Sequence, residues 1–226
     1  MEWGPLFLSI KLAACTTLIL FLFCVPFSYV LTLLNPRLRS FIEAGSNLPL
    51  VLPPTVLGFY LLIFLSPTSA LGEFLESTIS LRLVFSFEGL VFASCIYSFP
   101  FMLQPILAGM QSLPRQIIEL SYILGKGRFQ TLLRVIIPMI KPHLVKASMM
   151  TFAHTIGEFG VVLMVGGNLP GVTRVASVSI YDHFEKMNYA QAHYTSLVLL
   201  VFSFTLLWFL TTLTASDQTR NAPKFS

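Results

Sequence analysis

The chain has 226 residues, of which 55% are hydrophobic and only 11% are charged, and its mean hydropathy is +0.78. A soluble domain carries about 25% charged residues, so this composition argues against a soluble fold and predicts a protein that lies in lipid. The net charge of +4 is small, and the basic residues form no stripe of the kind that binds nucleic acid. The three cysteines stand in apolar runs without metal-ligand spacing, so we expect free buried thiols and neither a metal nor a cofactor.

Five apolar runs are long enough to cross a bilayer, which takes about 20 residues of helix. In chain order they cover residues 6–34, 48–65, 84–107, 144–165 and 194–213. The first run is too long for a signal-peptide core and no cleavage site follows it, so we expect it to be retained as a helix. Pro49, Pro53 and Pro54 are expected to break the entry to the second run, where the irregular backbone must be covered by protein.

These runs predict an all-α fold, a polytopic membrane helix bundle with five full spans and a partial helix near residues 175–184. We expect one domain over residues 6–213 and a short cytoplasmic tail over residues 214–226. Lys and Arg gather on the cytoplasmic side of membrane proteins. If the N-terminus lies outside, nine basic residues face inward and only three face outward, namely Arg82, Arg174 and Lys186. The predicted topology therefore has the N-terminus outside and the C-terminus in the cytoplasm.

The longest inward loop, residues 112–142, has the pattern of two short amphipathic helices. In the first, one apolar stripe is formed by Leu113, Ile117, Leu120 and Leu124. Ser112 and Pro114 are start signals and Gly125 is a stop signal. In the second, one face carries Phe129, Leu132, Leu133, Ile136 and Ile137. Pro138 then ends this helix or bends it into the next span.

Periodicity alone leaves two interpretations of this loop open. It can be a hairpin that lies on the lipid headgroups with its Lys and Arg toward anionic lipid. It can also be an elbow, held to the bundle by its apolar stripes, that presents polar groups to a cytoplasmic partner.

The spacing inside the loop resembles the EAA loop of ABC importer permeases, which reads Glu-Ala-Ala, three residues, Gly, nine residues, Ile-x-Leu-Pro. Here Glu119-Leu120-Ser121 is followed after three residues by Gly125, and after nine more by Val135-Ile136-Ile137-Pro138. The resemblance implies a coupling helix that docks on an ATP-binding subunit. It assigns this coupling to six residues: Glu119, Gly125, Lys126, Gly127, Arg128 and Pro138. The sequence contains no G-x-x-x-x-G-K-[ST] phosphate loop, so the chain is expected to be no enzyme and to need a partner ATPase.

Two further segments narrow the resemblance. Residues 48–62, LPLVLPPTVLGFYLL, resemble molybdate permeases, and residues 156–182 resemble the shared molybdate, tungstate and sulfate permease group. This implies a type I importer transmembrane domain in the inner membrane that carries molybdate or tungstate, with a sulfate or thiosulfate permease as the alternative. The implied partners are two ATP-binding subunits, a second copy of the chain, a periplasmic oxyanion-binding protein and membrane lipid.

Two other classes of membrane protein fit less well. A secondary transporter usually has paired intramembrane charges or internal repeats, and an intramembrane metalloprotease needs an H-E-x-x-H motif, which is absent.

His154 and Glu158 stand four residues apart on the fourth span and therefore on one helix face. We expect this pair to form a gate or an interhelical contact, because an acid at this depth must face protein or water. The alternative is a neutral Glu158 bonded to nearby backbone. Direct anion binding is disfavoured, since an ionised carboxylate repels an oxyanion. In the third span, Ser98 and Gln104 are expected either to line a polar path or to make helix–helix contacts.

Overall fold

The computed structural model describes residues 3–220, and in this part of the chain it contains helices and no strand. The all-α class is therefore confirmed. In chain order the elements are α1 (Trp3–Leu33), α2 (Pro36–Ser46), α3 (Leu48–Val51), α4 (Pro54–Leu65), α5 (Ala70–Ile79), α6 (Phe87–Gln111), α7 (Arg115–Ile123), α8 (Arg128–Thr131), a π-helical turn (Leu132–Ile136), α9 (Ile137–Met139), α10 (Lys141–Gly157), α11 (Gly160–Gly166), α12 (Ala176–Glu185) and α13 (Tyr189–Arg220).

Among the described residues, three helices are long and apolar enough to cross a membrane alone, namely α1, α6 and α13. Two bent pairs meet the same test together: α4 with α5, bent by 52°, and α10 with α11, bent by 62°. Counting each pair as one span gives up to five crossings, the predicted number, although the second then covers Pro54–Thr78 and not the predicted residues 48–65. The partial sixth helix is α12, with ten residues. The bend between α10 and α11 was not predicted.

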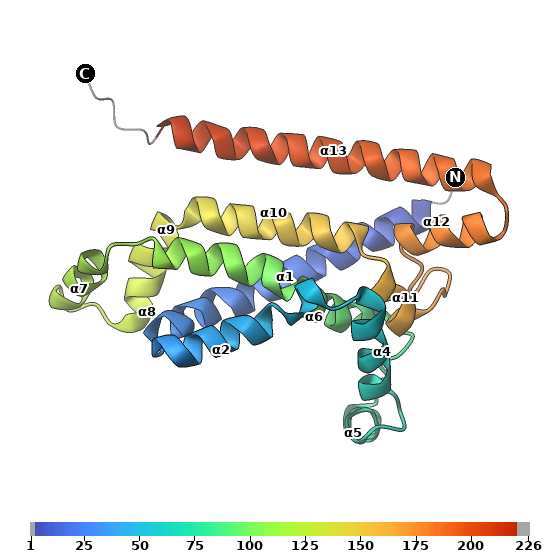
Figure 1. Cartoon of the computed structure of the whole chain (residues 1–226), viewed down its shortest axis with the longest axis horizontal. Coiled ribbons are helices and arrows are strands. Elements are labelled where there is room, and N and C mark those ends of the chain that lie inside the picture. The colour runs from blue at the N-terminus through green and yellow to red at the C-terminus, as the bar shows by residue number, and fades with distance from the viewer. Residues whose placement is uncertain (1–2, 221–226) are drawn as a thin grey trace.

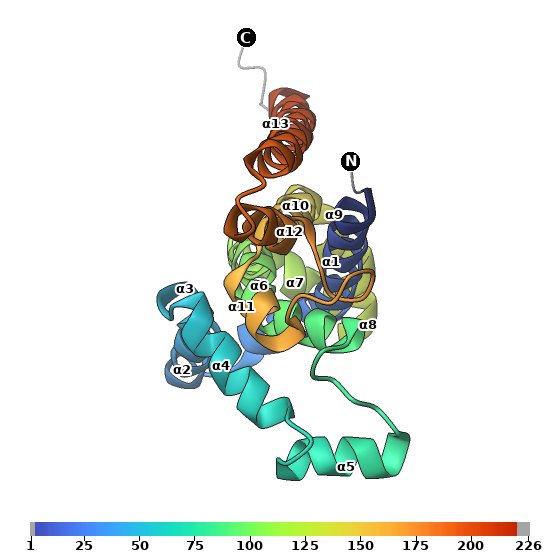
Figure 2. The same ribbon diagram turned by 90° about the vertical axis from the view of Figure 1, so that its right-hand side faces the viewer.

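The helices α1, α6 and α10 pack together as the centre of the bundle, as Figures 1 and 2 show. Their main core cluster includes Leu31, Met102, Leu103, Ile106 and Ile140, each no more than 1% exposed. The segment from α2 to α5 forms an arm along one side, and α13 lies on another side against α12 and α10 (Figure 2). The start of α1 lies at the opposite end of the bundle from α7, while α13 ends on the side of α7 (Figure 1).

The helical backbone is interrupted before α4 and again between α10 and α11, and each of these two interruptions has a local cause. Leu52 and Pro53 are extended, with ψ of 135° and 136°, because each of them precedes a proline. This confirms the broken entry that the prolines predicted. Between α10 and α11, Glu158 is extended at ψ 132°, and glycines flank the break at positions 157 and 160. Glycine is a weak helix former, and this was the only sequence signal of the second break.

Close backbone approach holds α4 against α11. A Cβ added to Gly58 would lie 2.7 Å from the Cβ of Met164 and 3.2 Å from the Cα of Val161. Only a residue without a side chain fits this contact, so Gly58 sets the distance between the two half-helices.

We therefore expect Gly58→Ala to destabilise the bundle by about 1–3 kcal/mol through overpacking. The matched control is Gly45→Ala in α2, where an added Cβ meets nothing within 4 Å. Both substitutions improve helix propensity by roughly 0.5–1 kcal/mol, so only the close contact separates them. Thermal unfolding of the purified protein in detergent measures the difference. Equal midpoints for the two variants would show that α4 and α11 do not pack this closely.

Candidate functional site

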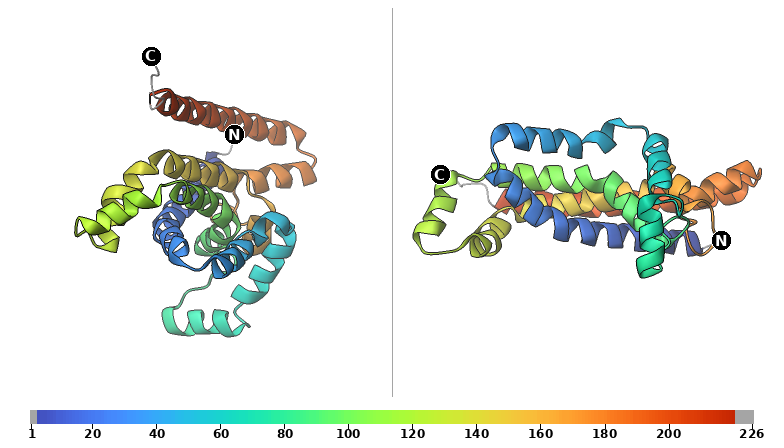
Figure 3. Two further views of the ribbon diagram at one scale, coloured as in Figure 1. Left: turned by 60° about the vertical axis from the view of Figure 1, so that its left-hand side comes forward. Right: turned by 90° about the horizontal axis from the view of Figure 1, so that it is seen from below.

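The loop between α6 and α10 forms an elbow, defined here as residues 112–139, that projects from one end of the bundle (Figures 1 and 3). Its first leg is α7, which ends in a Schellman turn. The N–H of Gly125 donates to the carbonyl of Tyr122 at 2.9 Å, and the N–H of Lys126 donates to that of Ser121 at 3.1 Å. Gly125 has φ +76°, a conformation that disfavours a Cβ. The predicted turn at Gly125 is confirmed.

The two legs of the elbow are held in place by hydroxyl groups to which the sequence analysis assigned no role. The hydroxyl of Ser121 is hydrogen-bonded to that of Thr131 in the second leg at 2.9 Å, and both residues are buried. The hydroxyl of Tyr122 is hydrogen-bonded to that of Tyr29 on α1 at 2.8 Å. Since the turn and both legs are fixed by hydrogen bonds, the elbow is a rigid unit attached to the bundle.

The elbow exposes apolar side chains that the sequence predicted to pack inward. Leu120 and Leu124, expected to pack inward, are 55% and 72% exposed, and Ile123 is 80% exposed. In the second leg Phe129 is 71% exposed. The side chains that pack inward from α7 are instead Ile118 and Ser121. The predicted inward packing of the stripe was therefore wrong at Leu120 and Leu124, which are exposed together with polar residues such as Glu119 and Arg128, whereas Leu113 and Ile117 are half-buried.

The six residues assigned to coupling all lie on this elbow. Glu119, Gly125, Gly127, Arg128 and Pro138 are exposed, and Lys126 is partly exposed. Pro138 comes two residues after the end of the π-helical turn, whose wider winding accommodates a ring that would strike the carbonyl four residues earlier in an α-helix. Glu119 makes no ion pair with any other residue that the structure describes, so its carboxylate is free to contact a partner.

A cavity of about 560 Å³ lies where the two helix breaks meet. Gly160 stands at the start of α11, and a Cβ there would lie 2.8 Å from that of Pro54 at the start of α4. The cavity is lined by Pro54, Thr55, Tyr97, Ala153, His154, Gly157, Glu158, Phe159, Gly160, Leu163 and Met164. Thus α4, α6, α10 and α11 all contribute to its wall, and both residues of the predicted pair lie in it.

His154 links α10 to α6. Its Nδ1 is hydrogen-bonded to the hydroxyl of Ser98 at 3.0 Å, and that hydroxyl is also hydrogen-bonded to Thr155 at 2.9 Å. The imidazole stacks on Phe101 with ring centroids 3.9 Å apart and lies 4.8 Å from the ring of Tyr97. Ser98 therefore makes a helix–helix contact. Gln104 does so too, because it donates to Asn47 at 2.9 Å.

Glu158 is only 4% exposed, and neither of its carboxyl oxygens has a hydrogen-bond partner among the described residues. Its side chain is not hydrogen-bonded to His154, although both line the cavity. Only its backbone is held, since its carbonyl accepts a hydrogen bond from Ser177 of α12 at 2.5 Å. A role of this pair as a gate stays a prediction.

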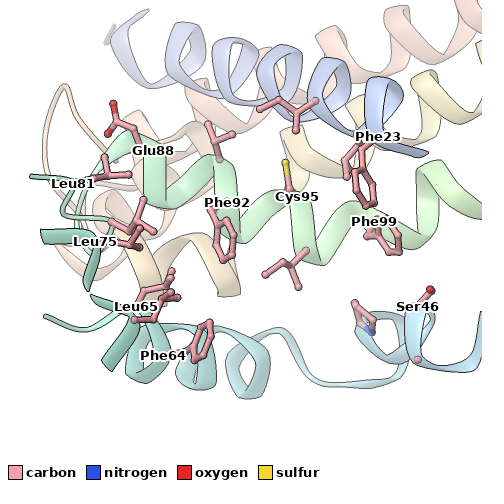
Figure 4. Close-up of a pocket in the computed structure, with 18 of the residues that line it drawn as sticks. Phe23, Ser46, Phe64, Leu65, Leu75, Leu81, Glu88, Phe92, Cys95 and Phe99 are labelled. Atoms are coloured by element: carbon pink, nitrogen blue, oxygen red, sulfur yellow. The ribbon is translucent and has the colours of Figure 1, made fainter. Parts of the chain in front are cut away.

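A larger cavity of about 1180 Å³ runs between α6 and the α2–α5 arm (Figure 4). Phe23, Phe92, Phe99 and Leu65 line it, with Glu88 toward one end and Ser46 toward the other (Figure 4). Its wall is almost entirely apolar, which suits hydrocarbon and not a hydrated anion. The smaller cavity at the breaks is therefore the better candidate for a polar path.

At the end opposite the elbow, a polar cluster fixes the loop between α11 and α12. Asp182 accepts hydrogen bonds from Lys186 and Asn168, both at 2.7 Å, and lies 3.8 Å from the guanidinium of Arg174. Arg174 in turn donates to Asn168 at 2.6 Å. The hydrogen bond from Lys186 is the main cause that lowers the pKa of Asp182, and Asn168 and Arg174 act in the same direction against partial burial. The carboxylate is thus ionised at neutral pH and holds this loop on α12.

Known proteins with a similar sequence identify the family of the chain. The family model described as the binding-protein-dependent transport system inner membrane component matches residues 24–216. The chain belongs to this family. It is 42% identical over 201 residues to the molybdenum transport system permease protein ModB of Azotobacter vinelandii, covering 89% of each chain. It is 31% identical to the probable sulfate transport system permease protein cysT of Prototheca wickerhamii, over 90% of this chain and 80% of that one.

A solved bacterial ABC transporter involved in the import of the acidic polysaccharide alginate has the same fold. Its TM-score is 0.76 with 16% identity, over 94% of this chain and 78% of the other. None of the described His, Cys, Asp and Glu side chains gather in groups of three that could hold a metal ion.

The contact of His154 with Ser98 has a specific energetic consequence. Ser98→Ala leaves the imidazole without its buried partner, so we expect a loss of about 1–3 kcal/mol of stability. Ser28→Ala is the matched control, because Ser28 on α1 is equally buried at 0% exposure and its hydroxyl has no hydrogen-bond partner among the described residues. Its removal is expected to cost little. Thermal unfolding in detergent measures both, and an equal loss in the two variants would mean that His154 does not anchor α10 to α6.

Proposed function

We propose that this chain is the membrane-spanning permease subunit of an ATP-driven ABC importer that carries molybdate, or tungstate, across the inner membrane. The observation that carries the proposal is the 42% identity to a molybdenum transport permease over nine-tenths of both chains. Relatives named as sulfate permeases are less similar, at 31% and below among those compared. Sulfate, also a tetrahedral dianion, is the second candidate substrate.

Coupling to ATP hydrolysis is assigned to the elbow. Its support is the exposed apolar surface of Leu120, Ile123, Leu124 and Phe129 on a rigid unit at the end of the bundle. A single exposed apolar side chain is ordinary, but four large ones within residues 120–129 indicate a contact surface. An ATP-binding subunit that receives this surface in a cleft would bury it and move the elbow as it binds and hydrolyses nucleotide.

The rest of the assembly follows from the same proposal. Two copies of the chain would enclose the path, and each would carry one ATP-binding subunit, while an external binding protein delivers the anion. The exposed apolar residues of α13, such as Leu200, Phe204 and Trp208, are free for lipid or for a second copy. The elbow would face the cytoplasm, which puts the start of α1 outside and the end of α13 inside.

Uptake by the reconstituted assembly tests the substrate. We expect proteoliposomes that hold this chain, its ATP-binding subunit and the external binding protein to accumulate molybdate only when ATP is present on the side of the elbow. Omitting the ATP-binding subunit is the control and should abolish uptake. Preferential accumulation of sulfate would assign the second candidate. Uptake driven by an ion gradient without the ATP-binding subunit would refute the ABC mechanism.

Two glycines of the elbow allow a matched test of coupling. Gly125→Asp forces a Cβ into a left-handed conformation, which costs about 1–2 kcal/mol, whereas Gly127 has φ −69° and accepts a side chain. Neither site has an atom within 4 Å of an added Cβ. We expect Gly125→Asp to insert normally but to lose most ATP-dependent uptake and stimulation of ATP hydrolysis, and Gly127→Asp, which adds the same charge, to lose less. Equal activity of both variants and the wild type would exclude the elbow from coupling.

A further inference from the structure

The cavity at the two helix breaks lies near the middle of the membrane. Tyr97, in its wall, is the eleventh of the 25 residues of α6, about 15 Å from the start of that helix and about 21 Å from its end. A bilayer core is about 30 Å thick, so the cavity is far from both surfaces. Non-helical backbone at this depth persists only where protein covers it or where it lines a water-filled space.

Two hydroxyl donors in the wall have no hydrogen-bond partner in the described part of the chain, whereas His154 is paired with Ser98. The hydroxyls of Thr55 and Tyr97 make no hydrogen bond to any other described residue. The N–H of Thr55 lies in the first turn of the 12-residue α4, where no intrahelical acceptor exists, and the positive end of that helix dipole faces the cavity. No Lys or Arg lines the cavity.

Glu158 is the independent sign that this space holds a polar ligand. Its side chain is more than nine-tenths buried in the cavity wall, and neither carboxyl oxygen makes a close hydrogen bond, although the hydroxyl of Ser94 on α6 faces the carboxyl group. No cation in the wall compensates a carboxylate there, and an ionised acid at mid-membrane depth is costly. The neutral acid, by contrast, carries an O–H that can donate to an anion.

Resting on the proposed function, we infer that this cavity is the point where the oxyanion crosses the bundle, received by the neutral donors Thr55, Tyr97 and Glu158. His154 is a positioning residue, since its ring, fixed by Ser98, packs beside that of Tyr97. Neutral donors bind a tetrahedral dianion through hydrogen bonds but add no fixed opposite charge. The hold is therefore weak enough for release, as a transport path requires.

The test removes single hydroxyl groups. In the reconstituted assembly, Tyr97→Phe and Thr55→Val are each expected to lower ATP-driven molybdate uptake about tenfold, the loss of one hydrogen bond to a charged group. Tyr60→Phe is the matched control, because Tyr60 also lies in this region of the fold, on α4, but is 64% exposed and lines no part of the cavity. It should transport as the wild type does. Size-exclusion chromatography in detergent should recover the same amount of assembled complex for all three variants, which shows that the assembly is intact.

Uptake by Tyr97→Phe and Thr55→Val equal to that of Tyr60→Phe would overturn the inference while leaving the proposed function in place. A wild-type assembly that moves no oxyanion would instead refute the proposed function. As a second readout, the ratio of molybdate to sulfate uptake should change in Tyr97→Phe, because groups that touch the anion sense its size. An unchanged ratio with lowered uptake would reduce Tyr97 to a structural role and also contradict the inference.

Discussion

The constraint on which this structure depends is that hydrocarbon offers no partner to a backbone N–H or C=O. A broken helix inside a membrane must therefore turn its open end toward protein or water. Two such breaks, before Pro54 and after Gly157, meet with Gly160 against Pro54. Each break is placed where the other can cover part of it. What remains uncovered lines one small cavity, and the polar groups of the bundle's middle gather there.

The same geometry connects the elbow with this cavity. The elbow continues through Pro138 into α10, whose 17 residues span about 26 Å and end at Gly157. The helix is tied sideways to α6 by His154 and Ser98 close to the break. If a partner subunit displaces the elbow, as proposed above, α10 connects that displacement to the wall of the cavity. The helix ends there, where Glu158 and Phe159 leave helical geometry.

Much of this architecture follows from the sequence because the signals are local. Apolar length gives the spans, Pro53 and Pro54 give the first break, and Gly125 gives the turn of the elbow. The second break has no proline, and its glycines are too common in membrane helices to predict a 62° bend. The outer face of α7 was also missed. Leu120 and Leu124 share a stripe with inward-facing residues, and periodicity cannot tell a stripe that packs on the bundle from one that awaits a partner.

The sequence could not predict that Ser98 is hydrogen-bonded to His154, or that the carboxyl group of Glu158 has no counter-charge, for another reason. Spacing four residues apart places His154 and Glu158 on one face only if the helix continues, and it ends at Gly157. The imidazole then turns to α6, while the carboxyl is left in the cavity wall without a counter-charge. A cavity with a lysine or arginine in its wall would trap a dianion in the low dielectric of the membrane. In the inferred path, a wall of neutral donors lets the anion exchange part of its hydration for hydrogen bonds and then leave.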